Sequence, residues 1–206
     1  MAERGRPRGF DRDAALDAAT KLFWCKGYSA TSIADLCAAM GIVSPSLYAA
    51  FGSKEALYAE AIGHYVKNYD APIWGRLDAT GKSARTSIED WLMASAAILP
   101  ATDRPGGCMV TLSAVGDDKT SELCDLLVQG RAESLRRIEA RLDRAAAEGE
   151  LSATLDLKGI ARFYVGVHQG MSVQARDGAT RADLEAMARS AMAAWDSLTG
   201  TKVSSS

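Results

Sequence analysis

Hydrophobic positions near the start of the chain recur at intervals of three and four residues, the spacing of an amphipathic helix. Leu16, Ala19 and Phe23 share one face of the first such segment. Asp11 precedes it as a capping residue, and Gly27 follows it where a helix commonly ends. The pattern predicts a first helix between these two residues.

The next segment repeats this pattern over a shorter length. Thr31 is the predicted N-cap and Gly41 the predicted end. Its apolar face has the spacing i, i+3, i+4, i+7, at Ile33, Leu36, Cys37 and Met40. The sequence therefore predicts a second, short helix.

Two more helices follow directly. Ser44 is the predicted cap of the third, and Pro45 occupies its first position, where a missing N–H group costs nothing. Gly52 ends that helix, and Ser53 caps a fourth that runs towards Asn68. Pro72 and the stretch Asp78–Ser83 are expected to break the pattern.

The second half of the chain is helical in the same way. Pro100 stops one helix, Asp156 caps a later one, and Thr180 with Asp183 forms a variant capping box. The predicted segments cover residues 88–99, 108–112, 121–148, 156–171 and 180–198. No strand-like alternation persists, so the sequence predicts an all-α fold.

The order of these helices suggests two domains. Residues 1–54 are expected to form a small N-terminal head with a basic arm, and residues 55–200 a larger helical bundle. The polar tail 201–206 is expected to be disordered.

Charge distinguishes the two parts. The chain of 206 residues carries a net charge of −2, but residues 1–54 hold seven Lys and Arg against five Asp and Glu. This asymmetry fits a head that faces phosphate and a body that faces away from it. No apolar run is long enough for a membrane span, and no secretory signal is evident, which predicts a cytoplasmic protein.

The sequence contains few residue patterns that are typical of enzymes. The four cysteines fit neither a zinc site nor a C-x-x-C redox pair, and there are only two histidines. Neither a nucleophile elbow nor a glycine-rich phosphate loop is present. The expectation is a protein without catalytic activity, metal or cofactor.

Residues 31–51 have the character of a helix-turn-helix: two short helices joined by a tight turn at 41–43. In such motifs the second helix enters the major groove of DNA. Helix N-termini, which attract phosphate, begin near Thr31 and Ser32, at Ser44, and at Ser53 with Lys54. Caps and short helices also occur in other all-α proteins, so the pattern alone leaves DNA binding open.

The stretches 27–36, 41–44 and 47–57 resemble the signature of the TetR (tetracycline-repressor-like) family. This resemblance implies an all-α homodimer with a three-helix DNA-binding head and a C-terminal domain that dimerises and binds an inducer. It implies roles in contact with double-stranded operator DNA for Thr31, Ser44, Pro45, Ser46, Tyr48 and Lys54. Thr31, Tyr48 and Lys54 would contact the backbone, and Ser44, Pro45 and Ser46 the bases.

The N-terminal arm allows two interpretations. Arg4, Arg6 and Arg8 alternate with Gly5 and Pro7. Such an arm can enter a minor groove, where the negative potential attracts arginine. It can equally be a disordered, solubilising tail.

The C-terminal half has a weaker pattern. Gly166 and Gly170 are four residues apart, which permits close helix approach. By resemblance to the family, the last two helices form the dimer surface, with candidates Phe163, Gly166, Gly170, Met171, Leu184, Met187, Ala191 and Trp195. Packing within one chain is the alternative.

A small-molecule pocket is expected between the helices of this half. The candidate lining residues are Trp91, Cys108, Phe163, Tyr164 and His168. Each of them can instead be ordinary core. Cys108 follows two glycines at a predicted helix start, where the dipole lowers a thiol pKa, so it is also a candidate electrophile or redox sensor.

Taken together, these features predict a ligand-responsive transcriptional regulator, a repressor released from a palindromic operator by an inducer of unknown identity. Two alternatives remain at this point. One is a ligand-binding helical scaffold without DNA binding, and the other is a regulator that senses through Cys108.

Overall fold

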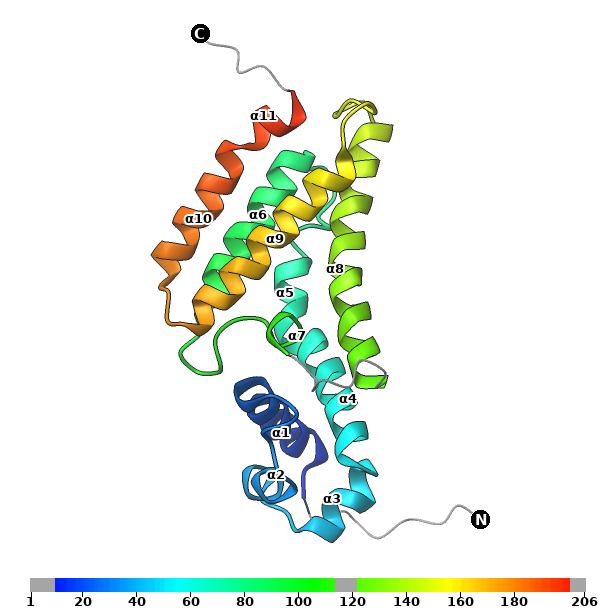
Figure 1. Ribbon diagram of the computed structural model, residues 1–206, viewed down its shortest axis with the longest axis vertical. Helices are drawn as coiled ribbons and strands as arrows, with labels where there is room; N and C mark the ends of the chain where they lie inside the picture. Colours follow the sequence, from blue (N-terminus) through cyan, green and yellow to red (C-terminus); the bar gives the residue numbers. More distant parts are fainter. Residues whose placement is uncertain (1–9, 114–121, 201–206) are drawn as a thin grey trace, which may run out of the picture. The chain divides into compact units, whose positions relative to one another are not determined.

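The computed structural model describes residues 10–113 and 122–200, and every regular element in these ranges is helical (Figure 1). The predicted all-α fold is therefore confirmed. In chain order the elements are α1 (Arg12–Lys26), α2 (Ile33–Met40), α3 (Ser44–Phe51), α4 (Lys54–Tyr65), η1 (Val66–Asp70), α5 (Ala71–Trp74), α6 (Ala84–Ile98), α7 (Met109–Leu112), α8 (Glu122–Ala147), α9 (Leu157–Arg176), α10 (Arg181–Ala193) and α11 (Trp195–Thr199).

The described residues form two compact units. The head unit comprises the described residues of Met1–Lys67 and Ser113–Leu126, and the body unit comprises those of Asn68–Leu112 and Leu127–Ser206. The sequence-based division after residue 54 differs from this one, because α4 packs on α1 as part of the head. Aromatic contacts hold the two helices together: Phe23 meets Tyr58 at 4.9 Å between ring centroids, and Trp24 meets Tyr65 at 4.8 Å.

Two predicted helix starts in the head are displaced by one residue. Ser32, not Thr31, caps α2, because Ser32 is followed three residues later by Asp35 and the two close a capping box. Val43, not Ser44, is the N-cap of α3, so Ser44 is its first residue and Pro45 its second. The predicted caps Asp11 and Ser53 are confirmed.

The expected break over residues 78–83 lies between α5 and α6, but Pro72 does not end the helical path as expected. The chain passes from α4 through the π-helix η1 into α5, where Pro72 lies in the first turn and has no intrahelical N–H partner to lose. The predicted last helix is in fact two, since the turn at Ala194 separates α10 from α11. The caps at Asp156 and Thr180 are confirmed.

The core of the body unit lies where α6, α9 and α10 pack side by side (Figure 1). Apolar side chains on the facing surfaces of these helices are almost completely buried: Ile88, Trp91, Leu92, Ala161, Met171, Leu184 and Ala188. Their removal from water is the main stabilising contribution to this unit.

Candidate functional site

The helix-turn-helix is formed by α2 and α3, whose axes meet at 90°. Gly41 makes the turn possible, because it adopts the left-handed conformation (φ 65°, ψ 32°) that favours glycine. The Ile42 N–H then donates to the Cys37 carbonyl oxygen at 3.1 Å. Two helices at this angle joined by a short glycine-containing turn are typical of DNA-binding helix-turn-helix motifs.

Side-chain hydrogen bonds within the chain occupy polar groups at the N-terminus of α2. The Asp35 carboxylate accepts from the Ser32 N–H at 3.0 Å and lies 3.3 Å from the Lys26 Nζ atom. Thr31 is only 1% exposed, and its hydroxyl donates to the Gly27 carbonyl oxygen at 2.6 Å. Of the two residues expected to contact DNA here, only Ser32 is exposed.

Helix α3 buries one side and exposes the other. Leu47 and Phe51 pack inward, whereas Pro45 and Ala49, four residues apart on the opposite side, are exposed. Tyr48 is 49% exposed. The predicted base-reading helix thus presents a surface of small side chains beside one aromatic ring.

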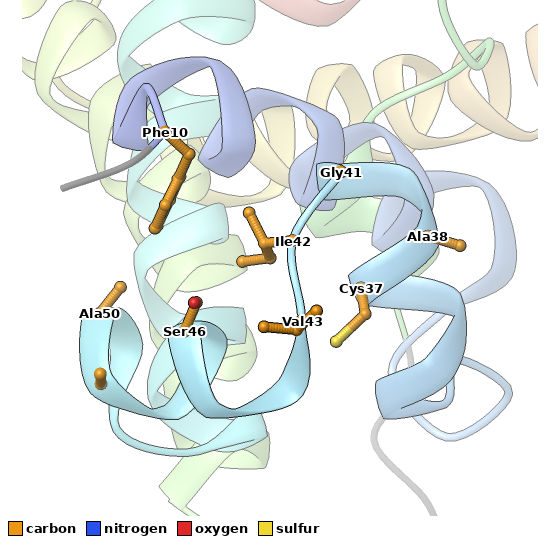
Figure 2. A pocket seen from close by; sticks show the side chains of 9 residues that line it. Phe10, Cys37, Ala38, Gly41, Ile42, Val43, Ser46 and Ala50 are labelled. Carbon is orange, nitrogen blue, oxygen red and sulfur yellow. The ribbon is translucent and has the colours of Figure 1, made fainter.

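A hollow of about 710 Å³ lies next to this surface. Figure 2 shows Val43 and Ile42 from the turn, Ser46 and Ala50 from α3, and Phe10 from the start of the described chain around it. Most of these side chains are apolar. The sequence pattern gave no sign of this hollow, because it depends on the angle between α2 and α3.

The N-terminus of α4 adds a cation to the head. Ser53 caps the helix by accepting from the Ala56 N–H at 3.1 Å. The Lys54 Nζ atom lies 4.2 Å from the centre of the Tyr28 ring, and the Tyr28 hydroxyl donates to Glu55. Burial, followed by the contact with Glu55, raises the pKa of Tyr28 to about 12. These contacts fix the start of α4.

The predicted arm residues Arg4, Arg6 and Arg8 lie outside the described residues.

Two of the predicted pocket residues meet inside the body unit. Trp91 and His168 are stacked with ring centroids 4.9 Å apart, and Trp74 lies 5.1 Å from Trp91 and 5.8 Å from His168. The Trp91 Nε1 and His168 Nε2 atoms are buried without a hydrogen-bond partner in the described part of the chain. Sequence reasoning missed Trp74, because Pro72 made its surroundings look like a break.

The other predicted pocket residues lie apart from this cluster. The Tyr164 hydroxyl donates to the Ala191 carbonyl oxygen at 3.3 Å, and its ring packs near Trp195. Cys108 is 4% exposed, and its backbone N–H donates to the Ser172 hydroxyl oxygen at 2.6 Å. Phe163 is 40% exposed.

The body unit holds two buried titratable groups with opposite pH responses. Burial lowers the pKa of His168 from 6.5 to about 4, so folding stability due to this group is complete above pH 6.5 and is lost towards pH 4. Burial raises the pKa of Asp70 from 3.8 to about 6, against smaller opposing effects of Trp74 and Arg137. Stability due to Asp70 is therefore complete below pH 3.8 and is lost as the pH rises through 6.

We expect these responses to oppose each other in the wild-type protein and to separate in two variants. When the pH falls from 8 to 5, the unfolding free energy of Asp70→Asn should fall by roughly 2 kcal/mol, because the remaining His168 is protonated only in the unfolded chain. Over the same fall in pH, the unfolding free energy of His168→Gln should rise by roughly 1 kcal/mol, because the remaining Asp70 becomes protonated in the folded chain first. Urea unfolding at both pH values measures this, and parallel pH profiles for the two variants would contradict it.

Only part of the predicted dimer set lies at the surface of the chain. Met171, Leu184, Ala191 and Trp195 are buried by helices of the same chain. Phe163 and Gly166 are exposed, and Gly170 and Met187 are partly exposed. A surface groove lies between α9 and α10, lined by Phe163, Val167, Asp183, Ala186, Met187, Ser190 and Ala191.

Residues 10–113 and 122–200 offer neither a metal site nor a membrane-spanning helix. No three His, Cys, Asp or Glu side chains in these ranges are grouped to hold a metal ion. No single helix there is long and apolar enough to cross a membrane, and α2 with α3 meets that test only as a pair bent by 90°.

These features define a class, that of helix-turn-helix proteins with a separate helical body. Residues 15–61 match the profile of the bacterial regulatory proteins of the TetR family, and residues 85–193 match the tetracyclin repressor-like C-terminal domain. The chain belongs to the TetR family and is a transcriptional regulator rather than an enzyme.

Individual relatives agree with this assignment. The chain is 36% identical to the HTH-type transcriptional repressor ComR of Escherichia coli K12 over 196 residues, which is 95% of this chain and 93% of ComR. It is 45% identical over 69 residues to the repressor BdcR of the same organism, 34% of this chain and 35% of BdcR. A cysteine-substituted variant of the TetR-family regulator CifR, solved with 26 bp operator DNA, is 41% identical with a TM-score of 0.87, covering 92% of this chain and 100% of that one.

Proposed function

We propose that this protein is a repressor that binds an operator in double-stranded DNA through α2, α3 and the start of α4. The observation that carries the proposal is the exposed face of α3, held at 90° to α2 by the turn at Gly41. Support comes from CifR, whose solved structure holds operator DNA. Such a regulator would act in the cytoplasm, where the DNA lies.

In this proposal the head residues have separate tasks. Ser44, Pro45 and Ser46 face base edges, and Ser32, Tyr48 and Lys54 contact the backbone. Thr31 supports the start of α2 through its bond to Gly27 instead of contacting phosphate. Arg4, Arg6 and Arg8 are proposed to enter the adjacent minor groove.

Lys54→Ala tests the phosphate contact. Because each neutralised phosphate releases counterions, we expect weaker binding to every duplex and a salt dependence that is shallower by about one unit of log–log slope. Fluorescence anisotropy of a labelled duplex across a salt series measures this. Lys158→Ala, which removes a lysine from α9 in the body, is the control and should leave the slope unchanged. An unchanged slope in the Lys54 variant would reject the assignment.

We propose that two copies associate through the exposed parts of α9 and α10, which would place two reading helices on one operator. A helix-turn-helix dimer matches half-sites that are about 34 Å apart or a multiple of this distance. Phe163, Gly166, Gly170 and Met187 remain as contact candidates, because the other members of the predicted set are buried within their own chain.

Gly166→Leu should weaken this association. A Cβ atom added to Gly166 would meet no atom within 4 Å outside its own stretch of α9, so the monomer tolerates the side chain, whereas a close helix contact does not. We expect a dimer dissociation constant at least about tenfold higher in sedimentation equilibrium, because overpacking of a contact costs about 1–3 kcal/mol. Gly63→Leu in α4 is the matched control, since that site is equally open within the chain. Equal dimer stability in both variants would exclude this face.

The proposed inducer site is the cluster of Trp74, Trp91 and His168. Its two unpartnered nitrogen atoms suit an apolar or aromatic ligand that brings a hydrogen-bonding group, because a buried polar group without a partner is costly. His168 would bind such a ligand in its neutral form at pH 7, given its low pKa. A sensing role for Cys108 gains no support from its nearly complete burial.

Ligand and operator should bind antagonistically, with a coupling of roughly 1–3 kcal/mol. The test titrates candidate aromatic ligands into free and DNA-bound protein and follows tryptophan fluorescence. Equal affinity in the two states would mean that the ligand does not control this operator.

A further inference from the structure

The helix-turn-helix lacks the side chains with which proteins most often read bases. Residues 32–53 contain no Arg, Lys, Asn, Gln, Glu or His. The one carboxylate, Asp35, is occupied by the Ser32 N–H and by Lys26. Apart from Tyr48, which is assigned above to the backbone, base reading from this segment must therefore rely on short side chains.

This absence restricts the possible readout. Guanine is read by Arg or Lys, adenine by Asn or Gln, and cytosine by Glu or Asp. The hydroxyls of Ser44 and Ser46 can donate or accept, so they fit several base edges without choosing among them. The remaining feature that distinguishes one base in the major groove is the C5 methyl group of thymine, which apolar side chains contact.

The exposed side of α3 offers such an apolar surface. Pro45 and Ala49 are exposed and lie on the same side of the helix, and Val43 at its N-cap is 65% exposed. Val43 and Ala49 also line the hollow of about 710 Å³, together with Phe10, Ile42 and Ala50 (Figure 2). A methyl group placed against this surface leaves water without displacing a polar contact.

We propose that Val43, Pro45 and Ala49 read the thymine methyl groups of each operator half-site, so that major-groove readout by α3 rests largely on methyl contacts. This inference rests on the proposed operator binding. It adds the chemical group that carries the specificity and the residues that contact it.

The probe is the duplex that the wild-type protein recovers from a pool with a randomised central region. Each thymine of one half-site is replaced in turn by deoxyuridine, which removes only the methyl group. We expect about fourfold weaker binding at two or three neighbouring positions, the loss expected from one buried methyl group, and almost none elsewhere. 5-Bromodeoxyuridine, whose bromine occupies a similar volume, should restore binding at those positions.

Protein variants connect the effect to individual residues. In Val43→Ala or Ala49→Gly, replacing thymine by deoxyuridine at one of the sensitive positions should no longer weaken binding, because the variant already lacks the contact with that methyl group. Val128→Ala on α8 removes the same atoms from another exposed valine and should retain every penalty. This double-mutant design isolates the coupling from any general loss of affinity.

Two results would overturn the inference. One is a duplex that tolerates deoxyuridine at every position, and the other is a uniform loss that does not depend on the variant, as expected for changed DNA stiffness. If the wild-type protein recovers no preferred duplex from the pool, the proposed operator binding itself fails, and that outcome is distinct from both.

Discussion

Ala49→Glu should lower operator affinity at least about 100-fold, roughly 3 kcal/mol, while leaving the fold intact. Ala49 is exposed on the outer side of α3, so a longer side chain there can extend into solvent without entering the buried core. In the proposed complex that side faces the major groove, where a carboxylate meets like charge and blocks close approach. Anisotropy titration with the selected duplex measures the loss, and circular dichroism verifies the helical content.

The matched control is Ala140→Glu, which adds the same charge at an exposed position in the middle of α8. We expect it to bind within about twofold of the wild type, because exposed substitutions away from the interface have small effects. Similar losses in both variants would attribute the effect to net charge and would contradict the assigned role of α3.

Gly107→Ala should destabilise the body unit by about 3 kcal/mol or more, equivalent to a thermal midpoint roughly 6–12 °C lower. Gly107 has φ +75°, and a Cβ atom there would collide with the Ser172 carbonyl oxygen and lie 2.6 Å from the Leu112 Cδ1 atom. The collision involves the backbone of α9, which cannot move as a flexible side chain does. Differential scanning calorimetry measures the expected shift.

Gly81→Ala separates the collision from the cost of the backbone conformation. Gly81 has nearly the same φ, +76°, with nothing within 4 Å of an added Cβ atom. We expect it to lose only about 1 kcal/mol, the cost of a left-handed residue. If the two variants unfold at the same temperature, the close packing of Gly107 against α9 is not present in the protein.

Much of the head could be predicted from the sequence because local signals agree there. Asp11 and Ser53 cap their helices as expected, and Gly41 makes the turn between α2 and α3. The errors at Thr31 and Ser44 are each one residue. Thr31 and Ser32 are adjacent candidates for one cap, whereas Val43 caps α3 without a side-chain hydrogen bond, which the residue pattern does not signal. Asp35, three residues after Ser32, places the cap of α2 at Ser32 by accepting from its N–H group.

The body could be predicted less well because its important contacts join distant parts of the chain. Trp74 meets Trp91 and His168 only after α5 and α9 pack on α6, and no local pattern predicts that contact. The burial of Met171 and Leu184 was likewise hidden, since a helical stripe fits a core and a dimer surface equally well. The break expected at Pro72 was wrong, because proline is tolerated in the first turn of a helix.

The most direct test of operator binding is the ratio of affinities for the selected duplex and for a random duplex of equal length. Both are measured by competition at physiological salt with the wild-type protein. If α3 reads a sequence, we expect the selected duplex to bind about 1,000-fold more tightly or better. Equal affinities would reduce the interaction to phosphate attraction and would contradict the proposal that this protein recognises an operator.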